Sequence, residues 1–351
     1  MKVPVSKLVA FCNAALLKAG VEADDARITA ETLVLTDTWG VFTHGTKNLR
    51  GYIQRIQGGG IRKNAQPKIT SEGPAWAVVD ADSALGMVGS SFAMRAAIAK
   101  ARAAGIAYVG VRNSCHFGAA GCYAAMAAEE GMIGLAMAND TPTMTVPGGR
   151  GLILGNNPFA CAIPTGEKHP ILLDIAMSVV AGGKVFAAAA LGQKIPNTWM
   201  VDSEGIPTTD PRLFPQEGAL LPMAGHKGYG LALLIETLSA ILTGASIASH
   251  VLSWSFGDAS RPTGHGAAFI AIDVKALMPI ETFKQRVHQT IQEIRAAPKA
   301  KSVDRIYVPG EMEWERREKA LAHGIEMPED VLMSLYLLRE EMGLDLEGIS
   351  A

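Results

Sequence analysis

The chain has 351 residues, 48% of them hydrophobic, and its 34 acidic and 32 basic residues give a net charge of −2. This length allows a large buried core and about two domains. Lysine and arginine form no long run, so the composition offers no basic surface for nucleic acid or an anionic membrane and favours a small-molecule partner. No segment reaches the roughly 18 uninterrupted apolar residues of a membrane span, so no membrane partner is expected.

The four cysteines carry no metal-binding pattern. None belongs to a CxxC pair, and the chain has no cluster of histidine and cysteine of the kind that zinc sites need. We therefore expect no bound metal. We interpret Cys12, Cys115, Cys122 and Cys161 as reduced, mostly buried thiols of a cytoplasmic protein.

The predicted elements begin with helices and then change character. Residues 1–60 have a helical pattern, with Gly40 and the three glycines at 58–60 as stops. From about residue 75, short β-like runs alternate with alanine-rich helices, and this alternation predicts an α/β layer. The predicted strands are 75–81, 106–114 and 132–140, and the predicted helices between them are 90–105 and 119–131.

The second half of the chain continues the alternation and then returns to helices. Strand-like runs occupy 159–165 and 170–178, a helix is predicted at 227–244, and a strand at 267–274. From residue 281 the pattern is helical again. We therefore predict two units, a helical domain formed by residues 1–74 and 281–351, and an α/β domain formed by residues 75–280.

The usual nucleotide and hydrolase motifs are missing. No GxGxxG lies between a predicted strand and helix, so a Rossmann domain is disfavoured. The "GGK" at 182–184 lacks the upstream glycine and the Ser/Thr of a phosphate-binding loop, and neither GxSxG nor HExxH occurs.

Instead, polar or ionisable residues stand beside glycine in several short clusters. A histidine in any one of them is most simply a hydrogen-bonded structural residue, but their joint order is far more specific. It closely resembles, from about residue 5 to 345, the malate/L-lactate dehydrogenase family that is unrelated to the Rossmann-type enzymes. The ordered motifs are "THG", "NSCHFGAAG", "GNNPFACAIPT", "LLDIAMS", "PTTDP", "LLPMAGHKGYGLAL", "FIAID" and "VPGE".

The resemblance implies a fold and an activity. Members of this family include ureidoglycolate and sulfolactate dehydrogenases, 2,3-diketogulonate reductase and reductases of piperideine- and pyrroline-2-carboxylate. They use NADH or NADPH to reduce a 2-oxo or cyclic 2-imino carboxylate, or they oxidise a 2-hydroxy acid. The implied fold is a mixed-sheet α/β cofactor domain without the glycine-rich fingerprint, with the active site against a helical domain, in a homodimer.

Two histidines are candidates for the proton transfer that accompanies hydride transfer. Histidine suits this role because its ordinary pKa lies near neutrality. His44 falls on the family's Ser-His-Gly histidine, and the resemblance implies a relay through the hydroxyl of Thr43 and the carboxylate of Asp174. His116 matches the histidine assigned as proton acceptor in the ureidoglycolate branch. We favour His44 and keep His116 in the site.

The resemblance also implies cofactor contacts. Lys227 is the natural phosphate partner, because an ammonium group is a compact point charge. Asn139 and Asp140, where the family more often has Asn-Ser, are expected near the nicotinamide ribose, although Asp140 could equally cap a turn. The full set is Asn139, Asp140, Asp174, Ile175, Ala176, His226, Lys227, Gly228, Gly310 and Glu311.

Position 48 departs from the family pattern. Relatives commonly carry an arginine there, one helical turn from the histidine, where it would hold a substrate carboxylate. This chain has Asn48. We expect either that Lys47 or Arg261 binds the carboxylate instead, or that the substrate presents a less charged group. Tyr52 is expected as a neighbouring hydroxyl contact.

Three alternatives to a 2-hydroxyacid dehydrogenase are considered. The same hydride and proton chemistry would reduce a cyclic C=N bond, with which Asn48 is compatible. A relative that binds the cofactor without catalysis is opposed by the retained His44, His116, Asp174 and Lys227. A metal-dependent enzyme is opposed by the lack of a ligand triad. NADH and NADPH cannot be distinguished from the sequence.

Overall fold

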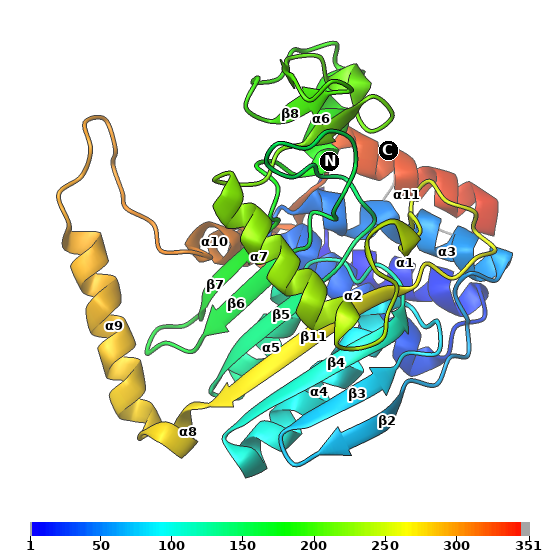
Figure 1. Cartoon of the computed structure of the whole chain (residues 1–351). Helices are drawn as coiled ribbons and strands as arrows, with labels where there is room; N and C mark the ends of the chain where they lie inside the picture. The colour runs from blue at the N-terminus through cyan, green and yellow to red at the C-terminus, as the bar shows by residue number, and fades with distance from the viewer. Residues whose placement is uncertain (1, 345–351) are drawn as a thin grey trace.

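A seven-stranded sheet forms the centre of the computed structural model, which describes residues 2–344 (Figure 1). β3 and β4 run parallel, whereas the other neighbouring pairs are antiparallel. This arrangement confirms the predicted α/β fold with a mixed sheet. In spatial order the strands are β2 (Lys68–Gly73), β3 (Trp76–Asp80), β4 (Ile106–Ser114), β11 (His265–Asp273), β5 (Met132–Ala138), β6 (Phe159–Ile163) and β7 (Ile171–Ile175).

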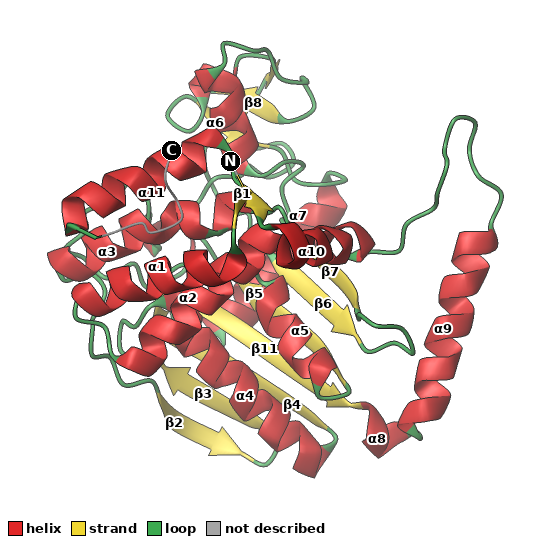
Figure 2. Cartoon of the chain, turned by 180° about the vertical axis from the view of Figure 1, so that it is seen from behind, coloured by secondary structure: helices red, strands yellow, loops and turns green. Residues whose placement is uncertain are grey.

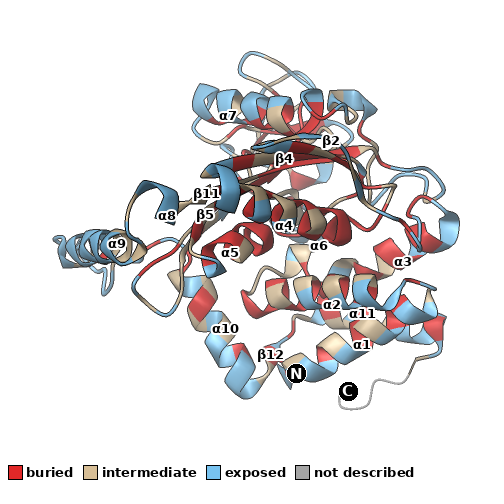
Figure 3. Ribbon diagram, turned by 90° about the horizontal axis from the view of Figure 1, so that it is seen from below, coloured by how far each residue is buried: buried red, intermediate tan, exposed pale blue. Residues whose placement is uncertain are grey.

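Helices cover both faces of the sheet. α7 (His226–Glu236) lies on one face, and α4 (Gly86–Ala104) and α5 (Gly121–Glu129) lie on the other (Figure 3). The buried sides of α4 and α5 are rich in alanine, which lets the helices approach the strands closely. At Gly134 on β5, a Cβ would lie 2.3 Å from the carbonyl oxygen of Ala124, so this approach requires glycine.

The two ends of the chain form a helical layer beneath α4 and α5 (Figure 3). Its core joins apolar residues from both ends, including Leu8, Leu33 and Leu335. The short strands β1 (Lys2–Val3) and β12 (Ile325–Glu326) pair antiparallel and tie the ends together. The helices of the layer are α1 (Val5–Lys18), α2 (Ala23–Thr38), α3 (Leu49–Gly58), α10 (Glu311–His323) and α11 (Glu329–Met342).

Two elements, β2 and α9 (Ile280–Ala296), are not placed as the predicted domain boundaries imply. β2 precedes residue 75, yet it pairs with β3 in the central sheet. α9 follows the short α8 (Val274–Leu277) and stands away from the helical layer (Figure 2). We propose a division in which the helical unit consists of α1, α2, α3, α10 and α11. Residues 345–351 of the predicted helical domain lie outside the described residues.

A small excursion follows β7. It contains α6 (Gly182–Ala190) and a three-stranded sheet of β8 (Met200–Asp202), β9 (Pro207–Thr208) and β10 (Gly218–Leu220), and it lies at the top of Figure 1. Its first helix, α6, begins shortly after the end of β7. Within residues 2–344, no helix combines the length and apolar character needed to cross a bilayer.

Candidate active site

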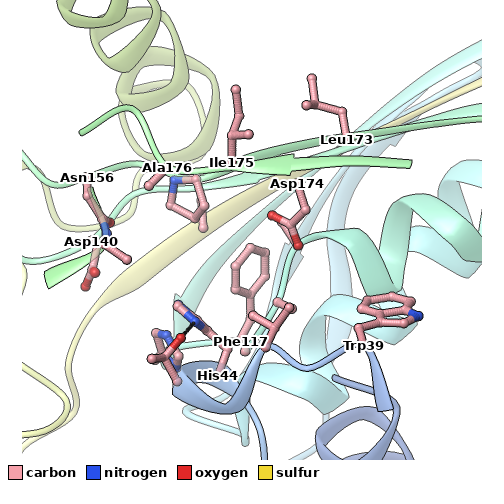
Figure 4. Close-up of a pocket in the computed structure, with 18 of the residues that line it drawn as sticks. Trp39, His44, Phe117, Asp140, Asn156, Leu173, Asp174, Ile175 and Ala176 are labelled. Carbon is pink, nitrogen blue, oxygen red and sulfur yellow. Dashed lines mark hydrogen bonds between the residues drawn. The ribbon is translucent and has the colours of Figure 1, made fainter. Parts of the chain in front are cut away.

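A cavity of about 610 Å³ lies between the sheet and the helical layer (Figure 4). This volume is within the range of roughly 300–1,000 Å³ that is usual for small-molecule and cofactor sites. The wall comes from distant parts of the chain: the turn before α3, the loop between β4 and α5, the ends of β5 and β7, the start of α6, the start of β11 and the turn before α10.

The structure brings about half of the expected site residues to this cavity. Those that line it are Thr43, His44, His116, Asn139, Asp140, Asp174, Ile175, Ala176 and Gly310. Those outside its lining are Lys47, Asn48, Tyr52, His226, Lys227, Gly228, Arg261 and Glu311.

His44 ends a short 3₁₀ helix, η1 (Phe42–His44), that carries it to the cavity. The Thr43 hydroxyl lies 2.9 Å from the His44 Nδ1 atom, so Nε2 is the ring nitrogen left for a ligand (Figure 4). Burial lowers the pKa of His44, while the charge of Asp140 opposes the shift. His44 is therefore a largely neutral imidazole with one nitrogen held in place.

A buried carboxyl group, that of Asp37, holds the turn around His44 in place. Asp37 on α2 accepts hydrogen bonds from the Thr46 N–H (3.1 Å) and the Thr46 hydroxyl (2.5 Å). Burial raises the pKa of Asp37 to about 7, against the effect of these bonds. A Cβ on Gly45 would lie 1.8 Å from Asp37 Oδ1, so the glycine after His44 is required for the turn to seat on Asp37.

His116 is held in an aromatic stack. Its ring lies 4.4 Å from the Trp254 ring and 5.5 Å from the His44 ring, measured between centroids. Its Nδ1 atom is hydrogen-bonded to the Tyr52 hydroxyl at 2.6 Å, so Tyr52 reaches the site through His116. Burial, reinforced by His44, lowers the pKa of His116 to about 3. A histidine so weakly basic is neutral at physiological pH.

Trp254 owes its position to a buried arginine. Arg55 on α3 is 2% exposed, and its guanidinium donates to the carbonyl oxygens of Ser253, Trp254, Asp258 and Arg261. The loop that carries Trp254 is thereby fixed to α3. The side chain of Arg261 is exposed and lies outside the lining of the cavity.

Asp140 is paired with a histidine that the sequence analysis did not single out. Its Oδ1 atom lies 3.1 Å from His265 Nε2 and accepts a hydrogen bond from the Thr141 N–H at 2.7 Å. Burial alone would raise the pKa of Asp140. The hydrogen bonds from His265 and the Thr141 N–H, together with the electrostatic influence of the His265 and His116 rings, outweigh burial and lower the pKa below its usual value, so Asp140 is ionised.

Asp174 differs from Asp140 in its hydrogen-bond partner and in the direction of its pKa shift. Its carboxylate accepts a hydrogen bond of 2.7 Å from the Gly121 N–H, at the start of α5. The side chain of Asp174 is open to the cavity. The many protein atoms around it nevertheless keep it poorly solvated, and this burial raises the pKa of Asp174 to about 6. Among the described residues, no hydrogen bond joins Asp174 to Thr43 or His44. The relay through Asp174 stays a prediction.

A buried amide network supports the Asp140 loop. Asn139 is 1% exposed, accepts from the Gly266 N–H at 2.8 Å, and donates to the Ser246 carbonyl at 2.8 Å. The Asp140 N–H donates to Asn157, whose amide in turn donates to the buried Glu236 carboxylate at 2.9 Å. The Asn139 side chain is therefore committed to holding β5 against β11.

The charged side chains next to His44 in sequence point to α11. Lys47 forms an ion pair with Asp330 at 2.6 Å, and Arg50 pairs with Glu341. Asn48 donates from its amide to the Thr43 carbonyl oxygen at 2.9 Å and so stabilises the turn. Substrate binding by Lys47 and Asn48 therefore stays a prediction without a supporting contact.

The expected cofactor residues at α7 and α10 are likewise apart from the cavity. His226 and Lys227 are exposed at the start of α7. Gly228 is a packing residue, because a Cβ there would lie 2.2 Å from the Met223 carbonyl oxygen. Glu311 lies behind the Gly310 turn, where it pairs with Arg295 and accepts from the Val308 N–H at 2.8 Å.

The cavity nevertheless offers a suitable place for a dinucleotide phosphate. Lys184, in the first turn of α6, lines the wall together with Ala181, the residue before that helix. A helix N-terminus with an adjacent cation attracts anions. No group of three or more potential metal ligands occurs among the described residues.

Sequence reasoning missed several residues of the site. His265 stands between two glycines in "TGHG", four residues after the expected Arg261, and Lys184 stands in "GGK", which was considered as a phosphate-binding loop. A polar residue beside glycine was the signal in each case. Trp254 gave no signal, because its contact with His116 depends on the packing of a loop far away in sequence.

The cavity thus brings together two histidines of lowered pKa, carboxyl groups and a lysine at a helix start, which are groups that can bind an anion and exchange a proton with it. Residues 3–336 match the family model described as malate/L-lactate dehydrogenase. Malate dehydrogenase of Pyrococcus horikoshii is 39% identical over 98% of this chain and 96% of its own length. L-Sulfolactate dehydrogenase of Methanocaldococcus jannaschii is 39% identical over 95% and 94%.

The comparison with solved structures points to the same family. The structure of the malate dehydrogenase from Pyrococcus horikoshii superposes with a TM-score of 0.89, at 37% identity, and covers 98% of this chain and 96% of that one. The chain therefore belongs to the malate/L-lactate dehydrogenase family. It is an NAD(P)-dependent oxidoreductase of 2-hydroxy and 2-oxo acids.

Proposed function

We propose that this enzyme transfers a hydride between the nicotinamide of NAD or NADP and C2 of a 2-oxo or 2-hydroxy carboxylic acid, with His44 as the general acid and base. The observation that carries the proposal is the pair of Thr43 and His44 at the cavity wall, with Nδ1 held by the hydroxyl at 2.9 Å and Nε2 left for the substrate.

The bound nicotinamide supplies or accepts the hydride. In oxidation the neutral His44 removes the proton of the substrate hydroxyl at Nε2, and in reduction the protonated form of His44 returns that proton to the substrate oxygen as the carbonyl carbon is reduced. His116 is too weakly basic to carry a proton near neutral pH. We assign it the role of a neutral hydrogen-bond donor, oriented by Tyr52 and Trp254, that holds the substrate.

The cofactor would lie along the other part of the cavity. The backbone from Asp174 to Ala176, the Gly310 turn and the start of α6 with Lys184 line this part. Lys184 suits a phosphate of either NAD or NADP. Lys227 stays a prediction, since it lies on the exposed end of α7.

We also propose that two copies of the chain associate through α7 and the helical turns that follow it. This face carries exposed apolar side chains, among them Leu231, Leu234 and Leu242, which are 47%, 52% and 59% exposed. Exposed leucines on adjacent turns indicate a surface that another protein covers. Leu234→Glu is expected to convert a dimer into a monomer in light scattering.

A second candidate is the reduction of a cyclic 2-imino carboxylate, an activity that also occurs in this family. The same His44 would donate the proton to the imine nitrogen. Rates with Δ1-pyrroline-2-carboxylate and with open-chain 2-oxo acids, each with NADH and NADPH, decide between the two.

The decisive test is His44→Ala beside His116→Ala. Loss of a general acid costs about 10²- to 10⁴-fold. We expect His44→Ala to lower kcat by that amount while NADH binding, followed by fluorescence, is unchanged. His116→Ala is expected to raise KM for the acid more than it lowers kcat. Equal kcat for His44→Ala and the wild type would overturn the assignment, and NADH binding without turnover in the wild type would indicate a non-catalytic relative.

A further inference from the structure

The cavity is poor in cations for a site that binds an acid. Three carboxyl groups line it, those of Asp140, Asp174 and Glu313. Apart from histidines, Lys184 is the basic side chain of the described lining, and arginine is absent from it. A substrate with two carboxylates would therefore meet more negative than positive charge.

The basic side chains nearest to His44 in sequence do not add positive charge to the cavity, because they form ion pairs outside it. Lys47 and Arg50 pair with Asp330 and Glu341 on α11. The amide of Asn48 donates to the Thr43 carbonyl oxygen. The turn that carries His44 thus brings no guanidinium or ammonium group into the cavity.

Asp140 lies at the part of the cavity where the substrate must react. Its charge acts on His44, His116 and His265, and the reacting oxygen must lie within hydrogen-bond reach of the proton donor (Figure 4). Asp174, on β7, lies with Ile175 and Ala176 on another side of the cavity in the same view.

One oxygen of Asp140 is available to a ligand. Both hydrogen bonds to the carboxylate, from His265 and from the Thr141 N–H, go to Oδ1. Among the described residues, none donates to Oδ2. A carboxylate has about four lone-pair positions, so Oδ2 can accept from a group inside the cavity.

We propose that Asp140 determines substrate specificity: its Oδ2 accepts a hydrogen bond from an N–H or O–H donor at the far end of the substrate. The substrate is then a 2-oxo or 2-hydroxy monocarboxylate with an amide, hydroxyl or cationic nitrogen group, and not a dicarboxylate. This inference rests on the proposed hydride transfer at C2. A second carboxylate is excluded because it would lie beside an ionised carboxylate with no cation between them.

The test compares two substrates of nearly the same shape, oxaloacetate and 2-oxosuccinamate, which differ by a carboxylate and an amide. With the wild type, we expect kcat/KM for the amide to exceed that for the dicarboxylate by about 100-fold. With Asp140→Asn the ratio should fall at least about 10-fold, mainly through a lower KM for oxaloacetate. 5-Guanidino-2-oxopentanoate as a third substrate shows whether the donor is neutral or cationic.

The matched control is Glu313→Gln, which removes a different charge from the cavity wall. It should leave the ratio of the two kcat/KM values unchanged, because Glu313 lies beside Asp174 and not beside the histidines. Asp140→Ser serves as a second variant if the asparagine variant has a lower Tm than the assay tolerates.

Three results would overturn the proposal. They are a wild-type preference for oxaloacetate, a ratio that Asp140→Asn leaves unchanged, and an effect of Asp140→Asn confined to KM for the nucleotide, which would assign Asp140 to the ribose.

Failure of the proposed hydride transfer is seen separately, as no turnover of any 2-oxo acid. Calorimetry on the NADH complex then still tests Asp140: succinamate should bind more tightly than succinate, and the reverse order would reject the inference.

Discussion

Asp140 and Asp174 line the same cavity, yet the pKa values of their carboxyl groups are shifted in opposite directions. Burial raises the pKa of both. At Asp140, His265 and His116 outweigh burial, whereas Asp174 has a single backbone N–H donor and feels the negative charge of Glu313. The pKa of Asp140 is lowered, and that of Asp174 is raised to about 6. The hydrogen-bond and charge partners, and not burial alone, decide in which direction the pKa of each carboxyl group moves.

This difference divides the cavity into two parts with different chemistry. The part beside the histidines has a fixed negative charge at neutral pH, next to neutral imidazoles that can exchange a proton with a substrate. The part beside Asp174 holds a carboxyl group that titrates close to neutral pH. The predictions below disturb one part at a time.

The largest effect is expected from Gly45→Ala, which disrupts the histidine part without touching either carboxyl group. The added Cβ would overlap Asp37 Oδ1, so the turn that carries His44 must move. A misplacement of about 1 Å can cost on the order of 100-fold. We expect kcat/KM to fall at least about that much, measured as NADH oxidation.

Gly166→Ala is the matched control for this change. Its Cβ would meet its neighbours at 3.6 Å or more, an ordinary contact, and it lies outside the cavity lining. Activity within about two-fold of the wild type is expected there. If Gly45→Ala were equally active, the close contact with Asp37 would not position His44.

Tyr52→Phe should have a smaller effect in the same part of the cavity. The substitution removes the hydrogen bond that orients His116, a loss of about 0.5–1.5 kcal/mol, or up to about 10-fold. Because His116 is assigned to substrate binding, KM for the acid should rise while kcat changes little. Tyr108→Phe also removes a buried hydroxyl bond, to Leu238, and should leave KM unchanged.

The two carboxyl groups should respond to pH with opposite signs. The folded-state pKa of Asp174 exceeds the ordinary value of 3.8, so stability present below about pH 4 is lost as pH rises through 6. Asp174→Asn removes this loss and should gain stability relative to the wild type between pH 4 and 7. The pKa of Asp140 is lowered, so its stabilising contribution is present above about pH 4 and is lost as pH falls through the lowered pKa; Asp140→Asn should therefore be less stable than the wild type at both pH 4 and pH 7.

Calorimetric Tm values at pH 4 and 7 test this pair of variants. Shifts of about 1–2 °C at pH 7, opposite in direction for the two variants, correspond to about 1 kcal/mol in a protein of this size. Shifts in the same direction would show that the surroundings of the two groups are more alike than their hydrogen bonds indicate.

Much of the fold could be predicted from the sequence, because strand and helix periodicity is local. β2 was missed since "KITSEG" is polar and its strand lies at the sheet edge, where alternation is weak. The place of α9 could not be predicted, because an amphipathic pattern identifies an apolar face but not its neighbour.

The site, like the fold, could be predicted from the sequence only in part. Motifs predicted that His44, His116 and Asp174 belong together, and all three line the cavity. The pairing of Asp140 with His265, 125 residues apart, and of Lys47 with Asp330, 283 residues apart, depends on folded geometry that no local pattern records.

The smallest effect is expected from Lys47→Ala and Arg50→Ala. Both residues follow closely after His44 in sequence, but they form ion pairs with α11 and do not line the cavity. Exposed ion pairs contribute about 0–1 kcal/mol, so unfolding in urea should show a loss of that size and kcat/KM should stay within about two-fold. A ten-fold rise in KM for the acid on Lys47→Ala would instead place its ammonium group on the substrate carboxylate. The charge at the histidine part of the cavity would then no longer be set by Asp140 alone, and a dicarboxylate would again be an acceptable substrate.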